Sequence, residues 1–269
     1  MEFVSFLKGQ YWRHYNIRKL NHGYRTDTKR SLTSKKWIMK NLKDMKVGDI
    51  VTADYRAAEV FKKYGIDYCC GGNQSLDRAA SEKKLDVAEL ELKLNHLDEV
   101  ETNHQLNYKD WNPGFLCDYI VNEFHNKVYR VLPELMAYLD KIVKVHGANH
   151  PELKAIANLF ALINTELPIH QHQEENVFFP AIKELENTDA TDAKRIINTQ
   201  YAQMMEEHEL VGGTMDKIKV LSKNYLVPDD GCNTYRVTYK MLEEFEDDLH
   251  THVHIENNIL FPKAVALAQ

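Results

Sequence analysis

The chain has 269 residues, of which 43% are hydrophobic and 28% are charged, and its formal net charge is −6. This composition is typical of a globular protein that is long enough to bury a substantial core. The sequence contains no run of about 18 apolar residues and no signal-peptide pattern, so we expect no segment that spans a membrane.

Residues 1–46 differ in charge from the rest of the chain. They carry 12 Lys/Arg against 3 Asp/Glu, whereas the remaining residues carry 22 against 37. We therefore expect a basic leader over residues 1–45 that has no part in the chemistry. It could be a disordered arm, a transit-like segment, or translated sequence upstream of a start at Met39 or Met45. The acidic body argues against nucleic acid as the main partner.

Residues 46–98 are predicted to form a small helical domain. A helix over about residues 53–64 ends at Gly65, which suits the C′ position, and Ser75 can cap the next helix. A third helix is predicted over residues 86–96, and a polar linker follows up to Trp111.

The cysteines are Cys69, Cys70, Cys117 and Cys232. Four cysteines do not make a disulfide framework in a chain of this length, which favours a reducing, cytoplasmic location. Cys69 and Cys70 precede two glycines and a helix N-terminus, where backbone N–H groups can stabilise a thiolate for nucleophilic chemistry or transient metal binding. The alternative is two small residues in a tight loop. Cys117 and Cys232 are expected to be structural.

Residues 112–268 are predicted to form an up-down four-helix bundle, which makes the whole fold all-α. Asn112 and Pro113 supply an N-cap and a first helical residue. Long helical segments joined by short turns pack as antiparallel neighbours. The four predicted segments span residues 113–145, 151–186, 189–225 and 234–268. Four prolines must kink or loosen these helices: Pro133, Pro168, Pro180 and Pro262.

One eleven-residue pattern occurs twice in the predicted bundle, at residues 170–180 and 252–262, with six identical positions. Each copy contains a His and a Glu four residues apart, which lie on the same face of a helix. These pairs are His170 with Glu174 and His252 with Glu256, and no other histidine of the chain has Glu or Asp at this spacing.

A further histidine lies upstream of each copy at nearly the same distance. His125 precedes His170 by 45 residues, and His208 precedes His252 by 44. The unit is therefore predicted to be two successive helical hairpins. All six candidate residues fall on the apolar stripes of their predicted helices, so they face the core. Three nearby histidines lie on the polar faces instead: His172, His250 and His254.

Four imidazoles and two carboxylates in one bundle core are costly unless they bind a cation. The six residues suit two metal ions, each with two imidazoles, that share Glu174 and Glu256 as bridges. Imidazole and carboxylate ligands without thiolate favour iron or manganese over structural zinc. Open coordination positions could hold a bridging oxo group, O2 or NO.

At these residues the chain resembles hemerythrin-like domains. With the Asp-Tyr-Cys-Cys-Gly-Gly loop of residues 67–72 it closely resembles the RIC family, the di-iron proteins for repair of iron centres, over roughly residues 46–265. The resemblance implies two iron ions per chain with a bridging oxo or hydroxo group, Glu174 and Glu256 as bridges, and a redox or iron-relay role for Cys69 and Cys70. The implied metal ligands are His125, His170, Glu174, His208, His252 and Glu256.

The resemblance further implies repair of iron-sulfur clusters damaged by nitric oxide or oxidants. Either iron donation or an enzymatic reduction of NO would serve this purpose. Damaged iron-sulfur proteins are then the partners and NO or O2 the small ligands, and the chain could form a homodimer. The alternative is an O2- or NO-binding or sensing protein of the hemerythrin type, although the His-x4-Asp of oxygen-carrying hemerythrins does not occur at these ligands. The Glu-x-x-His pairs of a ferritin-type oxidase are absent before His125 and His208.

Overall fold

The structure, a computed structural model, describes residues 42–97 and 107–269. Within these residues the regular elements are all helical, apart from one isolated bridge between Lys46 and Ser75. The predicted all-α fold is therefore confirmed. The basic leader up to residue 41 and most of the predicted linker lie outside the described residues. The division into domains stays a prediction.

The N-terminal helices are short and enclose their own apolar core. Gly65 follows the second helix with a φ of 64°, and the Ser75 side chain accepts a hydrogen bond from the backbone N–H of Arg78, as predicted. The predicted helix over residues 53–64 is wrong at its start, because Asp54 accepts a hydrogen bond from the backbone N–H of Arg56 and separates two helices. The elements are η1 (Leu42–Asp44), α1 (Val47–Ala53), α2 (Ala57–Lys63), η2 (Cys70–Asn73), α3 (Leu76–Glu82) and α4 (Val87–His96).

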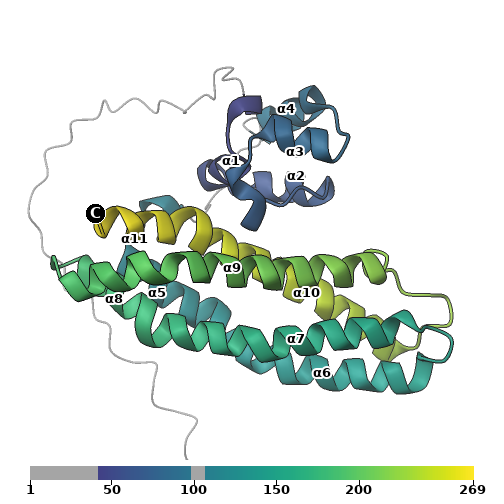
Figure 1. The fold of residues 1–269 in the computed structure, drawn as a ribbon. Coiled ribbons are helices and arrows are strands. Elements are labelled where there is room, and N and C mark those ends of the chain that lie inside the picture. The colour runs from purple at the N-terminus through teal and green to yellow at the C-terminus, as the bar shows by residue number, and fades with distance from the viewer. Residues whose placement is uncertain (1–41, 98–106) are drawn as a thin grey trace, which may run out of the picture. The chain divides into compact units, whose positions relative to one another are not determined.

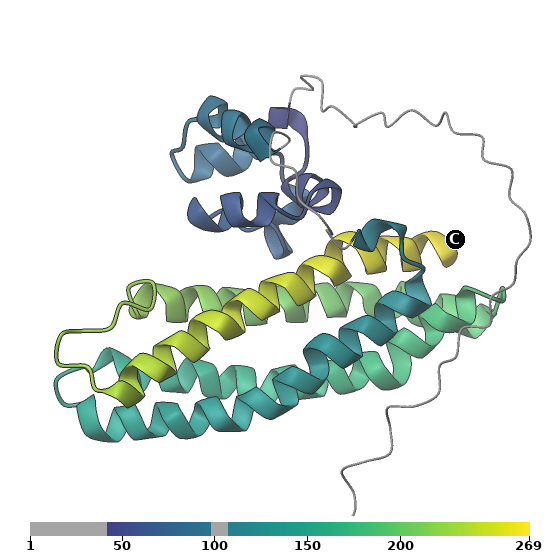
Figure 2. The same ribbon diagram turned by 180° about the vertical axis from the view of Figure 1, so that it is seen from behind.

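Four antiparallel rods form the bundle, as predicted (Figures 1 and 2). A short 3-10 turn, η4 (Tyr108–Asp110), precedes them, and the Asn112 side chain caps the first rod by accepting from the N–H of Phe115. The rods are α5 (Pro113–Ile120) with η5 (Val121–His125) and α6 (Asn126–His146); α7 (Glu152–Gln173) with η6 (Glu174–Phe178) and α8 (Phe179–Leu185); α9 (Thr191–Leu221); and α10 (Asn233–Ile255) with η7 (Glu256–Leu260) and α11 (Phe261–Leu267).

Three of the rods contain a five-residue π-helical turn, namely η5, η6 and η7. Pro180 and Pro262 follow η6 and η7, and the predicted loosening is observed there because proline cannot donate to the carbonyl four residues earlier. Pro133 and Pro168, in contrast, lie inside α6 and α7. π-helical turns are rare in proteins overall, and those that occur are often found at functional sites.

Side-chain amides bond the backbone at two of the π-turns. Asn122 donates to the carbonyl of Asp118 in the first rod, at 2.7 Å, and Asn176 donates to the carbonyl of His172 in the second, at 2.8 Å. Each amide therefore takes up a carbonyl four residues earlier in its own helix. Insertion of a side chain into the backbone ladder is a known cause of local widening.

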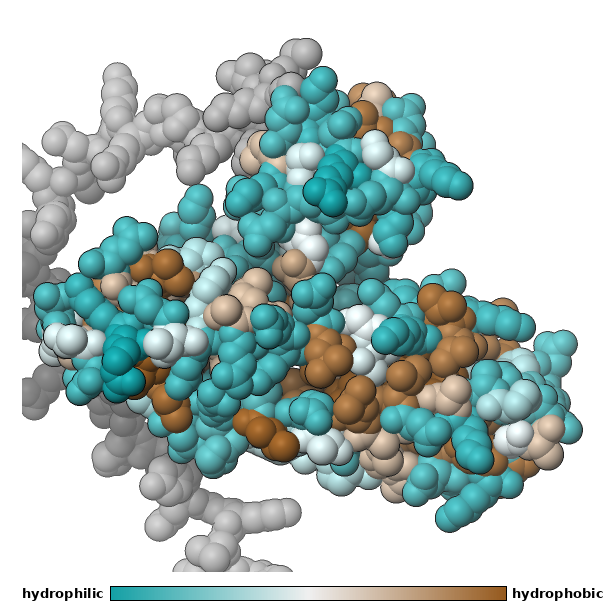
Figure 3. All heavy atoms as spheres, viewed as in Figure 1, coloured by the Kyte–Doolittle hydropathy of each residue, from teal (hydrophilic) through white to brown (hydrophobic). Residues whose placement is uncertain are grey.

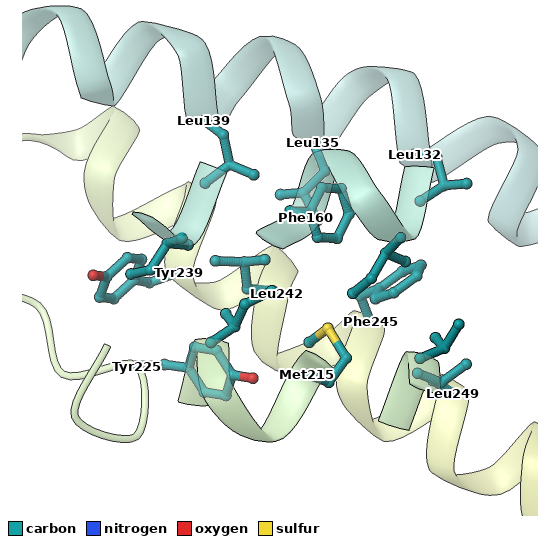
Figure 4. Close-up of a cluster of buried hydrophobic side chains, with 14 of the residues drawn as sticks. Leu132, Leu135, Leu139, Phe160, Met215, Tyr225, Tyr239, Leu242, Phe245 and Leu249 are labelled. Carbon is teal, nitrogen blue, oxygen red and sulfur yellow. The ribbon is translucent and has the colours of Figure 1, made fainter. Parts of the chain in front are cut away.

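The bundle contains two apolar cores rather than one. The Leu135 core, shown in Figure 4, includes Phe160, Met215 and Leu242 and lies toward the turns at residues 147–151 and 222–232. The Phe178 core fills the other end and is built from α5, α8, α11 and the first part of α9. Its fully buried members include Leu116, Phe178, Ile182, Ile197 and Phe261. Along each rod, a change from one core to the other occurs at the predicted metal ligands.

Large apolar side chains also reach the surface of the bundle on α7 and α9 (Figure 3). The most exposed ones on these helices are Leu162, Ile169, Leu210 and Val220. None of the described helices is long and apolar enough to cross a membrane.

Candidate metal centre

The six predicted ligands come together between the two apolar cores of the bundle. All of them are buried, with exposures from 0% to 4%. Each rod contributes at least one ligand: His125 ends η5, His170 and Glu174 lie where α7 meets η6, His208 lies in α9, and His252 and Glu256 lie where α10 meets η7.

The four imidazoles form two close pairs. The Nε2 atoms of His125 and His252 lie 3.1 Å apart, and those of His170 and His208 lie 2.8 Å apart. Each pair joins one histidine from each half of the sequence repeat. Two nitrogen lone pairs cannot face each other at such distances without repulsion, so each pair must share either a proton or a cation.

Glu174 lies between the two imidazole pairs. Its Oε2 atom is 3.3 Å from Nε2 of His170 and 3.4 Å from Nε2 of His125. Glu256 lies between them in the same way, since Oε1 is 3.0 Å from Nε2 of His252 and Oε2 is 3.3 Å from Nε2 of His208. This arrangement suits two carboxylates that each contact two cations.

The donor atoms of the site fit a metal ion. Glu174 and Glu256 are both 0% exposed, and no donor in the described part of the chain forms a hydrogen bond with either oxygen of Glu174 or with Oε2 of Glu256. Buried carboxylate oxygens nearly always have a donor or a cation, because leaving them unpaired is costly. Among the described residues, two groups could hold an ion here, and they share Glu174: His125 with His252 and Glu256, and His170 with His208.

Burial and the neighbouring charges together lower the pKa values of two of these groups, Glu256 and His208. Burial would raise the pKa of Glu256, but the neighbouring His252 and His125 outweigh burial and hold it well below its usual value. Burial lowers the pKa of His208, and repulsion from His170 lowers it further. His208 therefore favours its neutral form, which is the form that binds metal.

Three of the four histidines have a partner on the ring nitrogen that faces away from the site. Nδ1 of His125 lies 2.8 Å from Glu175, Nδ1 of His170 lies 2.7 Å from Glu207, and Nδ1 of His208 lies 2.7 Å from Asn257. Such acceptors fix the tautomer and turn the Nε2 lone pair toward a metal.

The sequence did not predict these partners, which are Glu175, Glu207 and Asn257. The one feature that could have indicated them is that each is adjacent in sequence to a candidate ligand. His252 differs from the other three, because none of the described residues forms a hydrogen bond with its Nδ1. Its ring stacks on Phe124 at 5.4 Å between centroids.

The three histidines that the sequence assigned to polar faces do not join the site. His172 is exposed and His250 is half-buried. His254 also lies on the predicted polar face of its helix, but it is 0% exposed. The expectation of a polar environment is wrong for this residue, because the loop at Tyr68 and the ring of Tyr55 cover it.

The loop with the paired cysteines is organised around Asp67. Its carboxylate accepts hydrogen bonds from the backbone N–H groups of Cys69 and Gly71, at 2.8 and 2.7 Å, and from the thiol of Cys69 at 3.1 Å. These N–H groups are therefore not free to stabilise a thiolate. The hydrogen bond with Cys70, followed by burial, raises the pKa of Cys69, which is the opposite of the shift expected from the sequence.

The ligand atoms of Asp67, Cys69 and Cys70 nonetheless lie within 4.8 Å of one another, which is close enough to hold a metal ion. The Cys70 sulfur also lies beside α9, since a Cβ atom built on Gly212 would be 3.3 Å from it. Gly212 is one helical turn from His208. The other two cysteines differ from each other: Cys117 is buried, as expected of a structural residue, whereas Cys232 is exposed.

Comparisons with known proteins agree with this geometry. A family model described as the hemerythrin HHE cation binding domain matches residues 118–264, and the ScdA_N model, described as a domain of unknown function, matches residues 43–98. The iron-sulfur cluster repair protein YtfE of Enterobacter sp. (strain 638) is 34% identical over 227 residues, which are 83% of this chain and 98% of that protein. The chain belongs to this family of iron-sulfur cluster repair proteins.

Other members of the repair family match the chain over a similar length. YtfE of Escherichia coli O8 (strain IAI1) is 34% identical over 83% of this chain and 98% of its own length. The repair protein ScdA of Staphylococcus epidermidis (strain ATCC 35984) is 32% identical over 81% of this chain and 96% of its own. The family resemblance expected from the sequence is thereby confirmed, and the cation-binding bundle agrees with the expected binding of iron.

Proposed function

We propose that this chain repairs iron-sulfur clusters that nitric oxide or oxidants have damaged, and that it does so with a di-iron centre. The observation that carries the proposal is the pair of buried carboxylates, Glu174 and Glu256, each of which lies between two pairs of imidazoles. The relatives are iron-sulfur cluster repair proteins, which supports repair rather than O2 carriage as the purpose of such a centre.

Two iron ions would be held by His125 with His252 and by His170 with His208, and Glu174 and Glu256 would bridge them. When bound, iron would supply redox chemistry and coordination positions for small ligands such as NO or O2. The protein's own groups hold the site ready: Glu175 and Glu207 accept the Nδ1 protons of His125 and His170, so that both Nε2 lone pairs face the centre.

The paired cysteines would act as a redox or iron relay between the centre and its clients. The closeness of the Asp67, Cys69 and Cys70 ligand atoms supports this role, as does the position of the Cys70 sulfur beside α9. The clients would be iron-sulfur proteins, and the activity would be iron donation or an enzymatic reduction of NO. A cytoplasmic location and a homodimer also stay predictions, which fractionation and light scattering test.

A repair assay tests the proposal. An iron-sulfur enzyme is inactivated with NO and mixed with the reduced, iron-loaded protein, and recovery of its activity is followed together with NO consumption. We expect recovery with the natural chain and a large loss of recovery with Cys69→Ala/Cys70→Ala. The matched control is Cys117→Ala/Cys232→Ala.

Two results would distinguish the activities. Recovery without NO consumption would indicate iron donation, and recovery that requires NO consumption would indicate reduction. Reversible binding of O2 by the reduced protein, with no recovery of the damaged enzyme, would contradict repair and favour a carrier of the hemerythrin type.

A further inference from the structure

The second copy of the sequence repeat uses both faces of its helix. One face of α10 and η7 provides His252 and Glu256 to the metal centre. The opposite face provides His254 and Asn258, and both contact the backbone of the cysteine loop. His254 donates through Nδ1 to the carbonyl of Tyr68 at 3.3 Å, and the Asn258 amide donates to the carbonyl of Cys69 at 3.2 Å.

The loop leaves space for the Asn258 side chain. A Cβ atom at Gly48 would lie 2.2 Å from Oδ1 of Asn258, and one at Gly72 would lie 2.8 Å from the same atom. No real Cβ contact is that short, so only glycine at these two positions allows Asn258 to insert between α1 and η2. The need for glycine at Gly72 therefore follows from the contact with the bundle helix.

The first copy of the repeat shows what the same residue types do without the loop. Asn176, at the position equivalent to Asn258, is exposed and donates to the carbonyl of His172 in its own helix. Asn258 lies at the third position of a π-turn, like Asn176, but its amide donates to the loop instead. The difference between the copies is therefore the loop contact and not the local helix geometry.

We propose that His254 and Asn258 form a loop-docking site that positions the two thiols against the bundle and sets the order in which they react. With the loop docked, Cys69 is 4% exposed and its thiol is held by Asp67, whereas Cys70 is half-buried. Cys70 therefore reacts in the docked state, and Cys69 reacts only when the loop leaves the docking site. The relevance to repair rests on the relay role proposed above, but the docking itself does not.

Alkylation of the individual thiols tests this inference. The iron-loaded full chain is treated with iodoacetamide, and peptide mass spectrometry gives separate rates for Cys69 and Cys70. Asn258→Ala should raise the Cys69 rate about tenfold, which corresponds to about 1.4 kcal/mol of lost docking stability. Asn176→Ala, the matched control, should leave both rates unchanged, and iron content should be equal in the two variants.

A second variant removes the same contact from the loop side. Gly72→Ala should raise the Cys69 rate as Asn258→Ala does, and the double variant should react no faster than the faster single variant, because both substitutions break one contact. Any of four results would overturn the proposal. They are an unchanged Cys69 rate in Asn258→Ala, an equal rise in Asn176→Ala, a loss of iron in Asn258→Ala, and additive effects in the double variant. If the alkylation rate of Cys69 rises while repair is undiminished, the result would support the docking site and contradict the relay role of the cysteines.

Discussion

Glu175 accepts a hydrogen bond from Nδ1 of His125 at 2.8 Å, and it also accepts one from the hydroxyl of Tyr129 at 3.3 Å. The carboxylate therefore orients a proposed iron ligand without belonging to the ligand set. We expect Glu175→Ala to weaken iron binding by about 10–100-fold, as loss of an outer partner of a metal-binding histidine usually does. Competition with a chelator of known affinity measures this change. Glu184→Ala, an exposed acid in the same rod, is the control and should bind iron as the natural chain does.

Stability of the bundle should depend on the Leu135 core. Leu135 is 0% exposed, so Leu135→Ala should lower the free energy of unfolding by about 2–5 kcal/mol through lost burial and a residual cavity. Val220→Ala, at a side chain 77% exposed, should change it by less than about 0.5 kcal/mol. Urea denaturation of the metal-free protein measures both. Equal effects of the two substitutions would contradict the described core.

The sequence predicted the burial of the six candidate ligands because helical periodicity alone determines which residues share an apolar stripe. His170 and Glu174 are one such case. The sequence could not predict that His125 pairs with His252 or that Glu207 contacts His170, since these contacts depend on how separate rods pack. The π-turn at Glu256–Leu260 was only partly predictable, from Pro262, and α1 was missed because it is a short helix with a glycine at its second position.

Cys232 should react with alkylating agents at unusually low pH. Hydrogen bonding to the backbone N–H of Tyr235, and then to His146, lowers the pKa of this exposed thiol to about 7. Because the thiolate is the reactive form, its rate should fall as pH drops through 7, whereas an ordinary cysteine loses its thiolate near pH 8.5. The pH profile of iodoacetamide labelling at Cys232 measures this midpoint. His146→Ala should move it upward, and an unchanged midpoint in that variant would exclude the assigned cause.

Removal of iron should destabilise the fold. A cation that binds only the folded state stabilises it by about 2.7 kcal/mol when its free concentration is about 100 times its dissociation constant. Anaerobic chelation should therefore lower the unfolding midpoint of the natural chain. In His170→Leu/His252→Leu the same treatment should leave the unfolding midpoint unchanged, since each imidazole pair has lost one member. A midpoint that falls equally in both proteins would place the stabilising cation elsewhere.

The iron content of the purified chain tests the central claim most directly. Protein prepared anaerobically with ferrous iron is freed of loosely bound metal and analysed by mass spectrometry for iron, manganese and zinc. We expect about two iron atoms per chain, one for each imidazole pair, with the same content in His172→Leu, an exposed histidine of the same repeat. His170→Leu/His252→Leu should lose most of the iron. Full iron content in that double variant, or zinc as the only metal of the natural chain, would contradict the di-iron centre.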